Sequence, residues 1–234
     1  MAVIHLVRHG QASFAAAEYD KLSPLGVRQA RVLGEALRSR LPSVDRVMSG
    51  SMARQRDTAT ECLAAMRHPV AEDSSGPGAV RLEIDPRWDE YDHREVIERH
   101  LPTYQSGVDE PTAAVSPKEA FRAMFDSALT RWTAGENDDD YIEAWAAFAS
   151  RAWDASHDLT ARLTRSQHAV VFTSGGVISA VTARLLGGDS QLWLKLSQVV
   201  VNTGVTKLVH GQRGVTLVSF NDHSHVPDEL LTYR

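Results

Sequence analysis

The stretch VIHLVRHG, residues 3–10, is a short and mostly apolar run that ends in an arginine, a histidine and a glycine. Such a run, followed at once by a turn, is typical of a strand buried on both faces of a sheet. Open α/β sheets bind ligands at the carboxyl ends of their strands, where Arg8 and His9 are expected to lie. A neutral imidazole can attack phosphorus, and an adjacent guanidinium can hold two phosphate oxygens. The stretch therefore predicts a central strand and a candidate phosphate site, and Gly10 is expected to let the backbone approach the ligand.

The chain after this stretch alternates helix and strand signals. Residues 23–24, Ser-Pro, are an N-cap and first-turn signature, and apolar residues then recur at helical spacing until Pro42. A strand is expected at 46–48, a helix with one buried face at 53–67, and a further strand at 80–84. This alternation predicts an α/β protein, a three-layer α/β/α sandwich around a mostly parallel sheet.

Strand signals stop between residues 86 and 167. A capping box opens a helix whose apolar face includes Phe121, and a second long helix is expected to carry Ile142 on its apolar face. We interpret these helices as an insertion at about 100–165 within a single domain that covers residues 1–234.

The sheet is expected to resume after this insertion. The pattern predicts a buried strand at 169–173, a helix at 177–186, and a closing hairpin of strands 205–209 and 215–220. A surface loop is expected at 73–79, which is rich in Ser, Gly and Pro.

The composition is that of an ordinary globular protein. The chain has 234 residues, 43% of them hydrophobic, and a formal net charge of −5, which argues against a surface that binds nucleic acid. Cys62 is the only cysteine, so no internal disulfide can form and a reducing compartment is expected. No apolar run reaches membrane-spanning length, and the chain does not begin with a leader-like pattern, so we expect a cytoplasmic protein that does not bind membranes.

A second candidate constellation is VMSGSMARQRDTA, residues 47–59. Small polar residues at the end of a strand, followed by a helix N-terminus, place backbone N–H groups where an anion can bind. Arg54 lies near the first turn of this helix and opposes the helix macrodipole, so stability alone gives no reason for it. Arg56 fits a solvated charge better.

Together these motifs resemble the signature of the histidine phosphatase superfamily, whose members have a phosphoglycerate mutase-like fold. The similarity rests on LVRHG at 6–10, on LSPLG at 22–26 with Gln-Ala at 29–30, and on 47–59, which ends in Arg-x-x-x-Thr-Ala. It reappears around Glu90, around Ser174-Gly175-Gly176 and at Asn202, while the region of about 100–165 is unmatched.

The resemblance implies a role for each matched residue. It makes His9 the nucleophile of a phosphatase that forms a phosphohistidine, and it makes Arg8 and Arg54 a clamp for the phosphate. It places Glu90 as the acid that protonates the leaving group, a task that suits a carboxyl in a semi-closed pocket. Gly175 is expected to contact phosphate through the start of a helix. No cofactor or metal is implied.

Ser174 departs from the family pattern, because a second histidine usually stands at this position. A hydroxyl can donate a hydrogen bond to phosphate but adds no positive charge, so we expect Ser174 to bind phosphate and turnover to be slow. The departure also leaves open a weakened phosphate-binding or regulatory member of the same fold. His93 is the nearest candidate to supply the missing imidazole, although an exposed loop histidine is the simpler interpretation.

Two other classes of enzyme remain open. Ser174, followed by Asp222 and by His223 or His225, has the residue order of an α/β-hydrolase triad, although Phe172 stands where that motif needs glycine. The same late Asp and His residues are the candidates for a metal-dependent hydrolase, although such a cluster is more often an exposed loop.

Within the resembled family, hydrolysis is favoured over mutase action. A mutase must hold a doubly charged substrate, and few basic residues lie near the motifs, namely Lys21, Arg87 and Arg94. The expected partner is a small phosphorylated substrate or a phosphoprotein, and a homodimer is compatible with the sequence.

Overall fold

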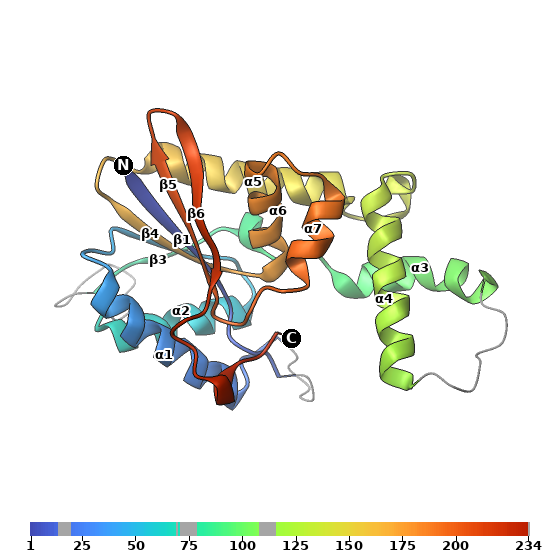
Figure 1. The fold of residues 1–234 in the computed structure, drawn as a ribbon, viewed down its shortest axis with the longest axis horizontal. Helices are drawn as coiled ribbons and strands as arrows, with labels where there is room; N and C mark the ends of the chain where they lie inside the picture. The colour runs from blue at the N-terminus through green and yellow to red at the C-terminus, as the bar shows by residue number, and fades with distance from the viewer. Residues whose placement is uncertain (14–19, 69, 71–78, 108–115, 234) are drawn as a thin grey trace. The chain divides into compact units, whose positions relative to one another are not determined.

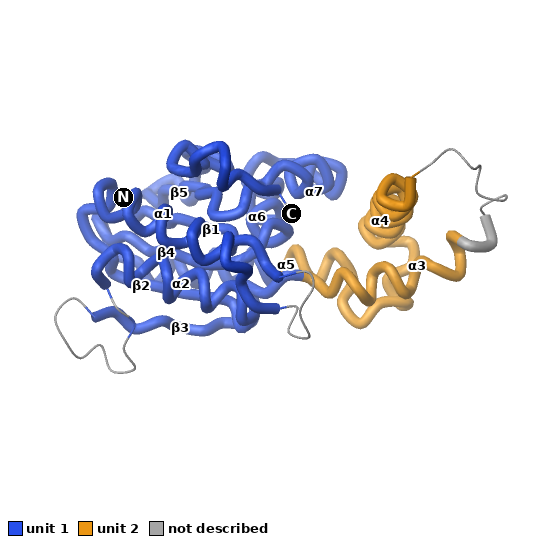
Figure 2. The backbone as a smooth tube through the Cα atoms, turned by 90° about the horizontal axis from the view of Figure 1, so that it is seen from below, with its two compact units in different colours: residues 1–90, 151–234 blue, residues 91–150 orange. Residues whose placement is uncertain are grey.

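The computed structural model describes residues 1–13, 20–68, 70, 79–107 and 116–233. These residues form two compact units, shown in different colours in Figure 2. The first unit combines Met1–Glu90 with Arg151–Arg234, and the second unit is Tyr91–Ser150. Most of the loop expected at 73–79 lies outside the described residues.

The first unit contains a six-stranded sheet with the strand order β3-β2-β4-β1-β5-β6. β1 pairs in parallel with β4, β4 with β2, and β2 with β3, while β5 and β6 are antiparallel. The strands are β1 Ala2–Arg8, β2 Arg46–Ser49, β3 Leu82–Ile84, β4 His168–Thr173, β5 Val205–Gly211 and β6 Gly214–Asp222.

Helices cover both faces of this sheet (Figure 1). α1 and α2 lie on one side, and α5 and α6 lie on the other, which confirms the predicted three-layer α/β/α architecture. The helices of this unit are α1 Pro24–Arg40, α2 Ala53–Met66, the C-terminal part of α5 Trp145–Arg162, α6 Gly175–Leu185 and α7 Ser190–Ser197, with short 3-10 helices η1 Pro86–Trp88 and η3 Asp228–Leu230.

The core between α1, α2 and the sheet explains why these segments fold as they do. Leu33 and Leu37 of α1 and Leu63 of α2 are buried against Val47 and Phe172 of the sheet. Their helical spacing is the signal that predicts both helices from the sequence. Helix α1 also begins as predicted, because the Ser23 side chain accepts a hydrogen bond from the Gly26 N–H.

The register of the parallel strands aligns their carboxyl ends. Arg8 of β1 stands opposite Thr173 of β4, and Ser49 of β2 stands opposite Phe172. Side chains that follow β1, β2 and β4 therefore meet at one edge of the sheet, which is where an open α/β sheet binds its ligand.

The second unit has its own aromatic core. Tyr91 lies 4.8 Å from Trp132 and 5.6 Å from Phe148, measured between ring centroids. The unit contains α3 His93–Gly107, α4 Pro117–Ala134, the 3-10 helix η2 Asp138–Asp140 and the first residues of α5. The insertion at about 100–165 stays a prediction.

Several sequence expectations differ from the structure. Ile142 is 87% exposed and precedes α5, because the chain turns through η2 and helix α5 starts only at Trp145. Phe121 is 57% exposed, since the buried face of α4 begins at Met124. Helical spacing predicts which residues share one face of a helix. It does not predict how much of that face is covered by neighbouring elements. The strand expected at 80–84 is shorter, and helices α3 and α7 are additional.

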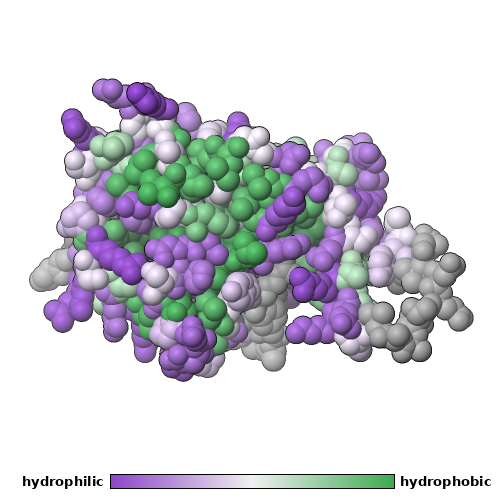
Figure 3. All heavy atoms as spheres, in the orientation of Figure 1, coloured by the Kyte–Doolittle hydropathy of each residue, from purple (hydrophilic) through white to green (hydrophobic). Residues whose placement is uncertain are grey.

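The β5–β6 hairpin was predicted and confirmed, and β6 is an edge strand of the sheet. Apolar side chains gather over this hairpin in the view of Figure 3, and Val218 of β6 is 53% exposed. An edge strand offers unpaired backbone groups to a second chain. The homodimer stays a prediction.

We predict that acid weakens the fold through His5. This side chain on β1 is 6% exposed and stacks on His168, and burial together with the charges of His168 and Lys207 lowers its pKa to about 4. Because the folded state disfavours the protonated form, stability is lost as the pH falls from 6.5 toward 4. The contribution is about 2 kcal/mol between pH 7 and pH 5.

Urea unfolding at pH 7 and pH 5 checks this expectation. His5→Phe, which keeps a planar ring next to His168, should lose less stability on acidification than the natural protein. His157→Phe, at an exposed position on α5, is the matched control. Equal acid sensitivity in His5→Phe and the natural protein would show that His5 does not carry the effect.

Candidate active site

His9 follows β1 directly and is held in one tautomer. Its Nδ1 lies 2.7 Å from the carbonyl oxygen of Gly10, and because a carbonyl only accepts, Nδ1 carries the hydrogen and donates it. Nε2 then bears the lone pair and accepts a hydrogen bond from Nε of Arg54 at 3.1 Å. Burial, followed by the charges of Arg54 and Arg8, lowers the pKa of His9 well below its usual value. The imidazole is therefore neutral, with its lone pair on Nε2.

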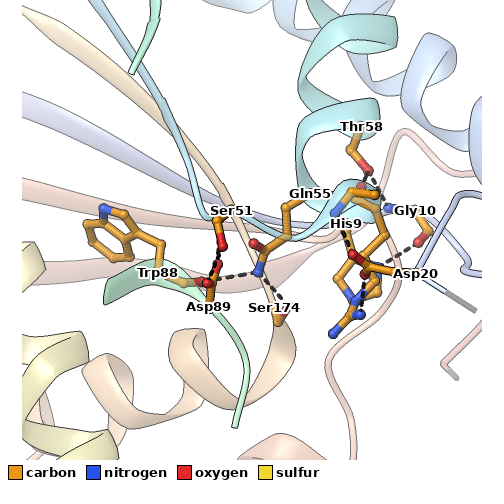
Figure 4. Close-up of polar contacts among 11 residues, drawn as sticks. His9, Gly10, Asp20, Ser51, Gln55, Thr58, Trp88, Asp89 and Ser174 are labelled. Atoms are coloured by element: carbon orange, nitrogen blue, oxygen red, sulfur yellow. Dashed lines mark hydrogen bonds and ion pairs between the residues drawn. The ribbon is translucent and has the colours of Figure 1, made fainter. Parts of the chain in front are cut away.

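Arg54 comes from the first turn of α2 and is tied to an acidic residue that the sequence analysis missed. Its Nη1 donates to Oδ1 of Asp20 at 2.7 Å, and the backbone N–H of Ala53 donates to Oδ2 at 2.6 Å. The Asp20 carboxylate thus neutralises the arginine and complements the helix N-terminus at the same time. The interactions around His9 appear on the right of Figure 4.

Arg8 is the last residue of β1, and its guanidinium is oriented by backbone carbonyls. Nη1 donates to the carbonyl oxygens of Val200 and Tyr233. A Cβ atom at Gly175 would lie 3.5 Å from Nε of Arg8, so the start of α6 is beside the guanidinium. The arginine and the positive end of a helix thus face the same space.

Ser174, at the N-cap of α6, is fully buried. Its Oγ accepts a hydrogen bond from Nε2 of Gln55 at 2.8 Å, and the same Nε2 donates to the carbonyl of Trp88 at 3.1 Å (Figure 4). The sequence analysis missed Gln55, although a signal existed. Gln55 lies on the buried face of α2, four and seven residues before Ala59 and Cys62.

Glu90 is brought to the same edge by a loop with several anchors. Its Oε2 accepts a hydrogen bond from the backbone N–H of Gly176 at 3.0 Å, at the N-terminus of α6. The carbonyl of Trp88 accepts from Oγ1 of Thr173 at 2.6 Å. The carboxylate of Asp89 accepts from the N–H and the hydroxyl of Ser51, both at 2.5 Å. The structure therefore brings His9, Glu90, Arg8, Arg54, Ser174 and Gly175 to the carboxyl edge of one sheet.

Asn202 links the nucleophile candidate to the C-terminal segment. Its Nδ2 donates to the carbonyl of His9 at 2.9 Å, and its Oδ1 accepts from Oγ1 of Thr232 at 2.9 Å. Thr232 also accepts from the side chain of Gln29 on α1. The backbone at His9 is thereby fixed by residues that are distant in the sequence.

The close approach at Gly10 involves another part of the chain. A Cβ atom at Gly10 would lie 2.5 Å from the carbonyl oxygen of Gly26 in the first turns of α1. The packing of α1 against the strand end therefore requires glycine at this position, and the approach of a ligand to this backbone stays a prediction.

The late Asp and His residues that would serve an α/β-hydrolase or a metal-dependent hydrolase make other contacts. Asp222 accepts a hydrogen bond from the N–H of Ser224 and lies 3.7 Å from Arg40, and Nδ1 of His223 lies 2.7 Å from the carbonyl of Asn221. Among the residues that the structure describes, no three His, Cys, Asp or Glu side chains are placed to hold one metal ion. His93 begins α3 in the second unit.

Comparisons with known proteins agree with this fold. The model of the histidine phosphatase superfamily (branch 1) matches residues 4–223. No curated protein matches the chain. None of the helices in the described ranges is long and apolar enough to cross a membrane.

Solved structures of similar fold cover nearly the whole chain. A mutant phosphoserine phosphatase from Entamoeba histolytica in complex with phosphoserine has a TM-score of 0.67 and 18% identity, and the match covers 97% of this chain and 100% of that chain. Phosphoglycerate mutase from Bacillus anthracis has a TM-score of 0.65 and 19% identity, with 96% and 94% covered. A mycobacterial glucosyl-3-phosphoglycerate phosphatase in complex with VO3 has a TM-score of 0.63 and 20% identity, with 94% and 98% covered.

Because the family model spans nearly the whole chain and these structures share its fold, the chain belongs to the histidine phosphatase superfamily, branch 1.

Proposed function

We propose that this protein hydrolyses phosphomonoesters through a covalent phosphohistidine on His9. The observation that carries the proposal is the state of the imidazole. Nδ1 donates to the carbonyl of Gly10, and the lowered pKa keeps Nε2 unprotonated, so a nucleophilic lone pair is available at neutral pH. Arg8 and Arg54, whose charges both act on the ring, supply the positive charge that a phosphoryl group needs.

In the first step, Nε2 of His9 attacks phosphorus and the bond from phosphorus to the ester oxygen breaks. Glu90 gives a proton to the leaving oxygen, so that an alcohol departs. The imidazole becomes positively charged while Nδ1 still carries its hydrogen, and the carbonyl of Gly10 stabilises this charge. The Nε–H of Arg54, which donates to Nε2 of His9 in the structure, turns to a phosphoryl oxygen in this step.

In the second step, water attacks phosphorus and Glu90 accepts its proton. The bond between Nε2 and phosphorus breaks, which regenerates neutral His9 and releases inorganic phosphate. The N-terminus of α6, which begins at Gly175 beside Arg8, favours the phosphate in both steps.

Family membership supports a phosphatase or mutase-like enzyme, and the solved relatives include phosphatases and a mutase. A mutase must hold a doubly charged substrate with basic residues. Arg87, a basic residue near the motifs, pairs with Asp85 and Asp158, so we favour hydrolysis. The substrate class is a phosphomonoester of a small molecule or of a protein, in the cytoplasm. Ser174 favours a second candidate, a phosphate-binding member of the fold with slow turnover, because a hydroxyl adds no positive charge.

We predict an acid-labile, base-stable label on His9 after brief exposure to radiolabelled phosphoserine or another labelled phosphomonoester. His9→Ala should abolish both the label and the turnover, because no other lone pair takes its place. His157→Ala, at an exposed position on α5, is the matched control and should keep both. Turnover that persists in His9→Ala would refute the covalent mechanism.

Anion inhibition gives a further prediction. Vanadate adopts the geometry of the transferring phosphoryl group and should inhibit by contacting His9, Arg8 and Arg54 together. Arg54→Gln should lower kcat by about two to three powers of ten, because it removes a positioned donor. A chelator and serine-directed acylating reagents should leave the rate unchanged. Loss of activity in a chelator without vanadate inhibition would favour a metallohydrolase, and inactivation by acylating reagents would favour a Ser174 nucleophile.

The ionisation of His9 can be measured directly by a pH titration of its ring resonances in NMR, assigned with His9→Gln. The His9 pKa should lie well below 6.5, because the ring is buried and two arginine cations act on it. Arg54→Gln should raise this pKa by removing one cation. Arg56→Gln, which removes an exposed cation from the same helix, should leave it unchanged. An ordinary His9 pKa in the natural protein would remove the main support for the nucleophile.

A further inference from the structure

The position of the missing second histidine holds a buried pair, Gln55 and Ser174. Both side chains are fully buried, and they come from different segments, the first turn of α2 and the N-cap of α6. Nε2 of Gln55 donates to Oγ of Ser174 at 2.8 Å. The serine at position 174 is therefore more than the loss of an imidazole, because the Gln55 side chain lies against its hydroxyl.

The amide of Gln55 occupies the space between the Ser174 hydroxyl and Gly50. On one side it touches Oγ of Ser174, and on the other its Oε1 lies 2.0 Å from where a Cβ atom of Gly50 would be. The chain thus uses glycine at position 50 to accommodate this amide. An imidazole at position 174 would overlap the Gln55 side chain unless that side chain were shortened.

The hydrogen bonds of Gln55 also fix the direction of the serine hydroxyl. Both hydrogens of Nε2 are used, one to Ser174 and one to the carbonyl of Trp88. Because Ser174 Oγ accepts from Nε2, its own hydrogen points away from Gln55. The next residue, Gly175, lies beside the guanidinium of Arg8, which is where the phosphoryl group is proposed to bind.

Stability alone does not account for Gln55. Its Oε1 is buried and has no hydrogen-bond partner among the described residues. An unsatisfied buried polar group costs about 1–3 kcal/mol, and an apolar residue on this face of α2 would avoid that cost. A buried amide that lowers stability in this way indicates that Gln55 has a role in the site.

We propose that Gln55 is a positioning residue, which orients the Ser174 hydroxyl to donate a hydrogen bond to the phosphoryl group. The pair then fills the place of the second imidazole with a neutral donor. This inference rests on the proposed phosphoryl transfer at His9, and Gln55 itself acts only through Ser174.

A double-mutant cycle of Gln55→Met and Ser174→Ala tests this coupling. Gln55→Met keeps the length of the side chain and removes its hydrogen bonds. With p-nitrophenyl phosphate as substrate, each single variant should lower kcat about tenfold, since one hydrogen bond to a charged group is weakened or lost. The double variant should be no slower than Ser174→Ala alone. Effects that multiply to about a hundredfold would mean that Gln55 acts independently, and would overturn the proposal.

Gln29 provides a matched control, because it is also a fully buried glutamine, and its side chain, on α1, contacts Gln11 and the C-terminal segment instead of Ser174. Gln29→Met should combine with Ser174→Ala multiplicatively. If Gln29→Met and Gln55→Met showed the same loss of additivity, the effect would be general destabilisation and the proposal would fail.

A second arm tests the space at position 174. Ser174→His alone should lower the melting temperature and should not speed the phosphorylation of His9, because the ring meets Gln55. The double variant Gln55→Ala with Ser174→His vacates that space, and its His9 phosphorylation should be at least about tenfold faster than that of Ser174→His. A stable Ser174→His protein that is faster than the natural one would contradict the proposal.

Calorimetry of vanadate binding to the Gln55→Met and Ser174→Ala variants and to their double variant separates this inference from the proposed function. If the natural protein and His9→Ala turned over equally, the covalent mechanism would fall. Non-additive vanadate binding of Gln55→Met and Ser174→Ala would still support the oriented hydroxyl, and additive binding would overturn it.

Discussion

The hydrogen bond from Nδ1 of His9 to the carbonyl of Gly10 is the interaction on which the site depends. It places the ring hydrogen on Nδ1 and therefore leaves the lone pair on Nε2, where Arg54 meets it. Burial and two nearby arginines make a protonated ring unfavourable, so the imidazole that we propose as the nucleophile stays neutral. In the proposed mechanism, the arginines supply positive charge for the phosphate and the imidazole supplies the lone pair for the attack.

That arrangement requires an arginine at the N-terminus of α2, where the helix dipole opposes it. Asp20 resolves this conflict, because its carboxylate pairs with Arg54 and accepts the N–H of Ala53. The arginine is thereby held in one orientation. Preorganised charge of this kind needs little rearrangement when the negative charge of the reaction develops.

The acidic side of the site is held by a different network. Thr173 and Gln55 both donate to the carbonyl of Trp88, so the loop that carries Glu90 is attached to β4 and to α2. Gln55 belongs to this network and to the Ser174 contact at once. Because Thr173 also donates to the Trp88 carbonyl, the loop keeps an anchor without Gln55, and it is a change at position 174 that has to be considered together with Gln55.

The sequence alone determined the layered α/β fold, because the helical spacing of α1 and α2 and the apolar strand before His9 depend on local periodicity. It also singled out Arg8, His9 and Arg54, whose motifs are contiguous in the chain. Only the tertiary structure decided the partners of these residues, since Asp20 and Gln55 act across 34 and 119 residues of chain separation. The spacing within α2 can show that Gln55 is buried, but it cannot show which residue it contacts, because these contacts arise where the carboxyl ends of β1, β2 and β4 meet.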